Sequence, residues 1–175
     1  MTITSTLLSL PAPSITLALG GIGTAYVFFT NISDAQRGII PLLNGKLGKV
    51  DIAEQERVRM WNVYFASAAK WVVGTSMFNA AVNLATSYYH PSPSIRLLTL
   101  LSGLFSLTIL PTTLVVGLLP INARLHALEK DGVEVRRSEG RDLVQGWEKR
   151  HLARVPLYGV AWALSFVAIL LERRV

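Results

Sequence analysis

The chain has 175 residues, of which 51% are hydrophobic and only 16% are charged, and its mean hydropathy is +0.41. Soluble domains contain about 25% charged residues, so this composition argues against a soluble protein and for a membrane protein. The chain has no cysteine, which excludes disulfides, thiolate metal ligands and cysteine nucleophiles. Its length suits one domain, and we expect a single integral membrane domain over residues 1–175.

Long stretches without charged side chains predict the membrane-spanning helices. No charged residue lies between Met1 and Ser33, and similar runs cover residues 71–95, 97–123 and 155–171. A helix needs about 20 apolar residues to cross a hydrocarbon core of about 30 Å. Backbone polar groups in lipid must be satisfied within their own segment, which favours helices over strands. We therefore predict an all-α fold, a bundle of four transmembrane helices at about 12–31, 62–87, 97–120 and 155–172.

The basic residues are distributed unevenly between the two sides of this predicted bundle. Five lie between the first and second spans and eight between the third and fourth, whereas the other side carries only Arg96, Arg173 and Arg174. Cytosolic loops of membrane proteins are enriched in Lys and Arg. We expect both long loops in the cytosol and both termini on the other side, in a multi-pass protein of the endoplasmic reticulum or another endomembrane. The net charge of +6 then reflects topology, and we expect no nucleic-acid partner.

Three further local patterns concern a proline, a histidine and a group of glycines. Pro111 lies near the middle of the third predicted span and should kink it. The short loop Tyr-His-Pro-Ser-Pro-Ser follows the second span, and we expect His90 within it to be solvated. Gly20, Gly21 and Gly23 in the first span favour close helix packing. The sequence leaves open whether copies assemble into a homo-oligomer.

The second predicted span carries polar residues on two opposite faces. Lys70 lies among small residues on one face, nine positions after Trp61 and thus roughly 13 Å deeper along a helix. A lysine at that depth either takes part in function or extends its amine toward the cytosolic interface. Asn79 and Asn83 lie on the other face, where they either bind a substrate or form hydrogen bonds between helices.

The segment that leads into the fourth span carries a regular polar pattern. Trp147, His151, Arg154 and Tyr158 follow one another at spacings of four, three and four, so they share one face of a continuous helix. Trp147 suits stacking on a flat aromatic ligand, His151 suits proton transfer near neutral pH, and Arg154 suits holding an oxyanion. An interfacial belt of aromatic and basic residues is the alternative. Pro156 is expected to interrupt the helix near Leu152.

A second polar group lies at the same predicted membrane depth. Asn122 and His126 are four residues apart at the end of the third span, and they point to one side if the helix continues past Pro120. We expect them to converge with Trp147, His151 and Arg154. His126 and His151 alternatively offer two ligands to a haem or metal, although we expect no metal.

Other chemistries find little support in the sequence. No glycine-rich phosphate loop, His-Glu-x-x-His or Gly-x-Ser-x-Gly motif is present. The predicted spans contain no carboxylate within the membrane, since Glu172 is the last residue of the fourth span, which argues against a proton-driven transporter.

The motifs at the two cytosolic helix ends resemble those of the DUF1772 family of small four-helix membrane proteins, which includes the fungal anthrone oxygenases. The similar elements are Leu-Leu-Pro-Ile-Asn-Ala-Arg-Leu, with Pro120, Asn122 and Leu125, and Gly-Trp-Glu-Lys-Arg-His-Leu-Ala-Arg, with Trp147, His151 and Arg154. The four-span layout matches as well. The resemblance implies a monooxygenase of polyketide biosynthesis that converts an anthrone to an anthraquinone with O2.

The resemblance also implies roles for the polar residues. His151 or His126 would remove a proton from the anthrone methylene, and Arg154, Lys70 and Asn122 would stabilise the enolate oxygen. Trp147 and Tyr158 would line the pocket, with Asn79 and Asn83 as further substrate contacts. The delocalised anion can react with O2 directly, so we expect no cofactor, and the expected partners are a hydrophobic aromatic substrate and membrane lipid. A non-catalytic four-helix scaffold or assembly partner is the alternative function.

Overall fold

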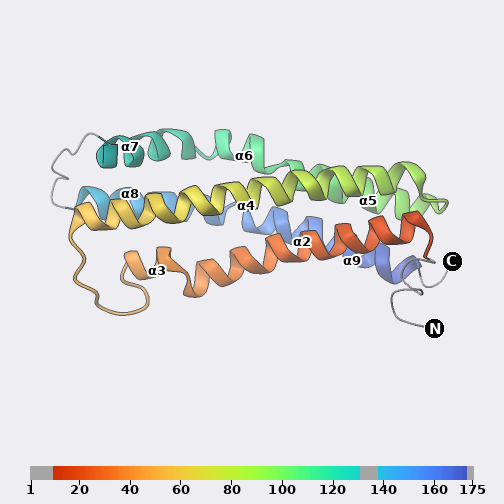
Figure 1. Cartoon of the computed structure of the whole chain (residues 1–175), viewed down its shortest axis with the longest axis horizontal. Helices are drawn as coiled ribbons and strands as arrows, with labels where there is room; N and C mark the ends of the chain where they lie inside the picture. The colour runs from red at the N-terminus through yellow and green to blue at the C-terminus, as the bar shows by residue number, and fades with distance from the viewer. Residues whose placement is uncertain (1–9, 131–137, 173–175) are drawn as a thin grey trace. The chain divides into compact units, whose positions relative to one another are not determined.

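The computed structural model describes residues 10–130 and 138–172, and within these two ranges it contains helices and no strand (Figure 1). The predicted all-α class is therefore confirmed. The helices are α2 (Ala12–Arg37), α3 (Ile39–Leu43), α4 (Glu54–Tyr89), α5 (Pro93–Leu107), α6 (Ile109–Val115), α7 (Leu118–Lys130), α8 (Glu139–Leu152) and α9 (Val155–Glu172).

Two helical stretches are long and apolar enough to cross a membrane, Ala12–Leu43 and Glu139–Glu172. The pair Pro93–Leu107 and Ile109–Val115 makes a third if the bent pair is one span. α4 is 36 residues long but is not among them. The described ranges thus support two or three of the four predicted spans. The second predicted span, 62–87, lies in α4, so this span and the side on which each loop lies stay predictions. Arg136, Arg137, Arg173 and Arg174, which entered the prediction of sidedness, lie outside the described residues.

The third predicted span is divided into three helices rather than one. α5 ends at Leu107, and α6 follows at an angle of 41°. Pro111 has no N–H to bond the carbonyl of Leu107, and its ring crowds that carbonyl, so the break falls where the predicted kink requires it. Gly117, with φ of +68°, then separates α6 from α7 in a conformation that residues with a Cβ rarely adopt. The predicted kink is therefore confirmed, and the stretch 97–120 is not one continuous helix.

The chain forms two compact units. Unit 1 comprises residues 1–28, 75–108 and 157–175, and unit 2 comprises residues 29–74 and 109–156. The chain passes from one unit to the other four times, so neither unit is a continuous segment. The single domain expected from the sequence stays a prediction.

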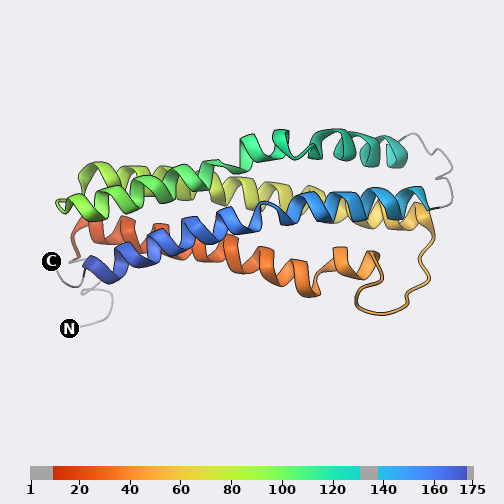
Figure 2. The same ribbon diagram turned by 180° about the vertical axis from the view of Figure 1, so that it is seen from behind.

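Unit 1 contains α5, the first part of α2, the second part of α4 and most of α9, which run side by side (Figures 1 and 2). Its apolar core is small, with Leu17, Ile95 and Ala168 buried. Between the helices lies a series of hydrogen-bonded polar side chains. Ser102 donates to the carbonyl of Ala161 at 2.8 Å, and Ser165 donates to Asn83 Oδ1 at 3.1 Å.

His90 is a buried residue of unit 1, with 5% of its surface exposed, so the prediction that it is solvated was wrong. Its Nδ1 accepts a hydrogen bond from the backbone N–H of Ser92 at 3.1 Å. Its Nε2 lies 3.9 Å from the carboxylate of Glu172, which also accepts a hydrogen bond from Ser14. His90 therefore holds the turn after α4 against the end of α9 rather than facing water.

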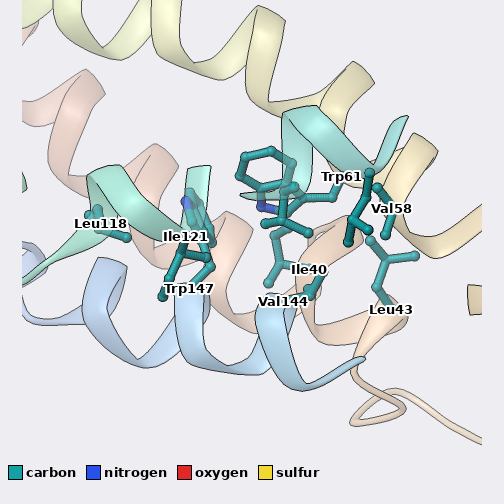
Figure 3. Packing of buried hydrophobic residues seen from close by; sticks show 10 residues of the cluster. Ile40, Leu43, Val58, Trp61, Leu118, Ile121, Val144 and Trp147 are labelled. Carbon is teal, nitrogen blue, oxygen red and sulfur yellow. The ribbon is translucent and has the colours of Figure 1, made fainter. Parts of the chain in front are cut away.

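Unit 2 contains the end of α2, the first part of α4, and α3, α6, α7 and α8 around a larger apolar core. α7 and α8 pack against each other, and α8 also packs against α3. Figure 3 shows the core side chains, among them Trp61 from α4, Ile121 from α7 and Trp147 from α8. Glu148 on α8 accepts a hydrogen bond from Asn44 at 2.7 Å and pairs with Lys46 at 2.8 Å, which fixes the segment after α3 to α8.

Candidate active site

A mostly apolar pocket lies within unit 2. Its volume is about 110 Å³, slightly below that of the 150 Å³ cavities known to hold one benzene ring. Val73 lines it while remaining 37% exposed, so the pocket reaches the surface of the unit beside Val73. The lining residues are Asn31, Tyr64, Phe65, Ala68, Ala69, Val72, Val73, Ile109, Thr113, Leu118, Asn122, Trp147, His151 and Arg154.

The break between α8 and α9 positions Arg154 in this pocket. α8 ends at Leu152, as the position of Pro156 predicts, and the N–H of Arg154 bonds the carbonyl of His151 in the turn that follows. The guanidinium then contacts two side chains. Its Nη2 donates to Nδ1 of His151 at 2.5 Å, and its Nη1 donates to Thr113 Oγ1 at 3.0 Å. Arg154 thus joins α6 to the end of α8, and it is 8% exposed.

The contact with Arg154 determines the tautomer of His151. A guanidinium has only hydrogen-bond donors, so Nδ1 of His151 must be the acceptor, and the neutral ring carries its proton on Nε2. In this arrangement Nε2 of His151 can donate a hydrogen bond and has no free lone pair to take a proton. The geometry therefore places two donors together, Arg154 and His151, which can stabilise negative charge on a ligand oxygen.

Trp147 lies at the centre of a group of aromatic rings. One face stacks on His151, with ring centroids 4.7 Å apart and planes 9° from parallel. Trp61, Tyr64 and Phe65 meet it at nearly right angles, between 5.8 and 6.4 Å away. His151 therefore takes one of the two faces on which Trp147 could stack with a ligand. The indole N–H is buried and has no hydrogen-bond partner among the described residues, so it is available to a ligand.

Asn122 on α7 also lines the pocket. α7 begins at Leu118 and continues through Pro120, which is tolerated because a proline in the first turn of a helix removes no intrahelical bond. The side-chain oxygen of Asn122 is buried without a partner in the described part of the chain. His126, one turn later, is exposed and lies outside the pocket, against the rings of Trp61 and Phe65. The predicted convergence of Asn122 with Trp147, His151 and Arg154 is therefore found, and that of His126 is not.

The other predicted site residues lie elsewhere. Lys70 is exposed on α4 and does not line the pocket, whose α4 wall is formed by the face that carries Ala68 and Val72. Tyr158, Asn79 and Asn83 belong to unit 1. Tyr158 and Asn79 border a small cavity of that unit, while Asn83 bonds Ser165.

Several lining residues were missed in the sequence, above all Tyr64 and Thr113. Tyr64 donates a hydrogen bond to Asp34 Oδ2 at 3.2 Å. The sequence signal for Tyr64 was its position three residues after Trp61, near the start of the second predicted span. A tyrosine near the end of a span is typical of an interfacial anchor. Thr113 lies within an apolar run, and only its contact with Arg154 marks it.

The part of the chain that the structure describes contains no group of three or more His, Cys, Asp or Glu side chains arranged to hold a metal ion. His151 has its Nδ1 occupied by Arg154, and His126 lies outside the pocket. The residues at the pocket therefore do not fit a site in which His126 and His151 together bind a haem or metal.

Comparison with known protein families gives one match, to the anthrone oxygenase model, over residues 61–164. Comparison with curated proteins and with solved structures gives no match. The matched segment includes every residue that lines the pocket except Asn31. Because the model covers more than half of the chain, the protein belongs to the anthrone oxygenase family.

Proposed function

We propose that the protein is a membrane oxygenase that converts an anthrone-type polycyclic phenol to its anthraquinone with O2 and without a cofactor. The observation that carries this proposal is the meeting of three donor side chains, Arg154, His151 and Trp147, in an apolar pocket within the family segment. In the proposed reaction, one methylene carbon is oxidised to a carbonyl. One oxygen atom of O2 enters the product, and the other leaves as water.

The donors suit the charge that this reaction develops. Loss of a methylene proton places negative charge on the ketone oxygen, and the Arg154 guanidinium and the Nε2–H of His151 would stabilise it. The N–H of Trp147 would supply a third donor, and Asn122 Oδ1 would accept from a phenol hydroxyl. The electron-rich anion would then react with O2 at the carbon to give a peroxide. Elimination of hydroxide from the peroxide, with loss of the second methylene proton, would give the quinone.

The apolar walls suit a planar hydrophobic substrate. A tricyclic ketone exceeds the pocket volume of about 110 Å³, so part of it would remain at the opening beside Val73. Such a compound partitions into lipid, which gives a reason for carrying out the reaction in a membrane protein. We place the protein in the endoplasmic reticulum or another endomembrane, as a multi-pass protein of polyketide metabolism.

The test is formation of anthraquinone from emodin anthrone under air, in membranes with and without the protein, with spontaneous oxidation subtracted. We expect an oxygen-dependent rate above background that His151→Ala removes while the protein still folds. His126→Ala is the matched control, because His126 lies outside the pocket. If several anthrones give no excess rate, the oxygenase proposal is refuted and a non-catalytic membrane scaffold becomes the better explanation.

A further inference from the structure

We propose that Tyr64 and Asp34 form the base that removes the methylene proton. This inference rests on the proposed oxygenase function and assigns to it a pair of residues that the sequence did not suggest. The need for such a pair arises from His151, whose Nδ1 is occupied by Arg154 and whose Nε2 carries a proton. A ring held in that tautomer stabilises an anion and does not take a proton from carbon.

Tyr64 lies where a base is needed. It is a lining residue of the pocket, on the same wall as Phe65 and Ala68. Its ring packs edge-on against Trp147, with centroids 6.4 Å apart, so its direction is fixed by packing. Its hydroxyl donates to Asp34 Oδ2 at 3.2 Å, which turns the oxygen lone pairs away from Asp34. A proton from a substrate would reach a lone pair of Tyr64 as the proton of Tyr64 passes to Asp34.

Asp34 is suited to receive that proton. It borders a second, very small cavity of unit 2, together with Tyr64, Glu148 and His151. The cavity volume is about 10 Å³, which is the size of one water molecule. Glu148 is the other carboxylate there; its Oε2 is engaged by Asn44 and Lys46, and its Oε1 has no partner among the described residues. Neither Glu148 nor these partners line the main pocket. Asp34 is therefore the carboxylate that is hydrogen-bonded to a residue lining the main pocket, Tyr64.

The proposed step balances without a further reactant. The C–H bond breaks, its electron pair enters the ring system, and the resulting oxyanion is held by Arg154 and His151. The proton goes to the oxygen of Tyr64, whose own proton goes to Asp34. After O2 has formed the peroxide at carbon, the proton returns to it. The same pair removes the second methylene proton as the O–O bond breaks, and hydroxide leaves to become water.

The first experiment compares Tyr64→Phe with wild type, using emodin anthrone with hydrogen or deuterium at the methylene carbon. The substitution keeps the ring and removes only the hydroxyl. We expect a rate loss of about 10²-fold, as for other general bases, and a larger isotope effect, because proton removal becomes rate-limiting. Tyr88→Phe is the matched control, since Tyr88 is 73% exposed in unit 1, and it should behave as wild type.

The second experiment tests Asp34 by chemical rescue. Asp34→Ala should lose activity to a similar degree, and added formate should restore part of it by replacing the carboxylate. Glu148→Gln serves as the control, because a structural role predicts a lower Tm with no response to formate. A wild-type rate and isotope effect in Tyr64→Phe, or no response of Asp34→Ala to formate, overturns the proposal. If the wild-type protein oxidises no anthrone, the proposed function itself fails before any variant is compared.

Discussion

The two units use buried polar side chains in different ways. In unit 1, Asn83, Ser102 and Ser165 lie between helices and form hydrogen bonds with one another and with the backbone. In unit 2, Arg154 bonds both His151 and Thr113, and all three line a pocket of about 110 Å³ in which Trp147 and Asn122 keep polar atoms without partners among the described residues. Unit 1 also leaves Ser76 and Asn79 atoms without a described partner, but around a cavity of only about 10 Å³. Unsatisfied polar atoms around a cavity that can hold a ligand are therefore the stronger signs of function.

The largest expected effect comes from Arg154→Lys, which tests whether the unit 2 polar residues serve chemistry. A lysine keeps the charge but cannot donate to His151 and Thr113 in the fork geometry of a guanidinium. We expect anthraquinone formation to fall by about 10²–10³-fold, as on loss of an oxyanion donor. Arg150→Lys is the control, because Arg150 is exposed on α8, the helix that ends just before Arg154. Equal rates in both variants would show that Arg154 is only an anchor.

Asn83→Leu tests the other side of the comparison. The change removes the acceptor of Ser165 and the donor to the carbonyl of Asn79. We expect it to destabilise the fold by about 1–3 kcal/mol, measured as a lower Tm in detergent, while the rate per folded molecule stays unchanged. A lost rate at an unchanged Tm would mean that unit 1 also serves the reaction.

Gly20→Ala tests the packing around Asn83 from α2. A Cβ at Gly20 would lie 2.8 Å from the side-chain oxygen of Asn83, so the amide must shift. We expect a smaller loss of stability than for Asn83→Leu, again by Tm. Gly74→Ala is the control, because nothing lies within 4 Å of a Cβ there. If Gly20→Ala is as stable as Gly74→Ala, the contact with Asn83 is not tight in solution.

The smallest effect is expected from Lys70→Met. Lys70 is exposed and lies outside the pocket, so both the Tm and the rate should remain those of wild type. A large loss of rate, measured in the anthrone assay, would return Lys70 to the site and show that the exposed face of α4 also contacts substrate.

The sequence predicted those features that follow from local pattern. The all-α class, the break at Pro111 and the end of α8 before Pro156 depend on proline chemistry and hydropathy, which neighbouring residues determine. The grouping of Trp147, His151 and Arg154 followed from helical spacing. The hydrogen bond between Tyr64 and Asp34 could not be predicted, because it joins two helices whose residues lie 30 positions apart in sequence. The tautomer of His151 could not be predicted either, because it depends on which ring nitrogen Arg154 contacts.

The short turn between α8 and α9 has a consequence for how this protein can vary. Arg154 reaches both His151 and Thr113 only because two residues separate Leu152 from Val155. One residue added or removed there would rotate the guanidinium by about 100° about the helix axis, while both helices could still form. The length of this turn is thus constrained together with the identity of Arg154, because either change removes the guanidinium from His151 and Thr113. Among divergent members of the family, a change in turn length should mark those that have lost or altered their chemistry.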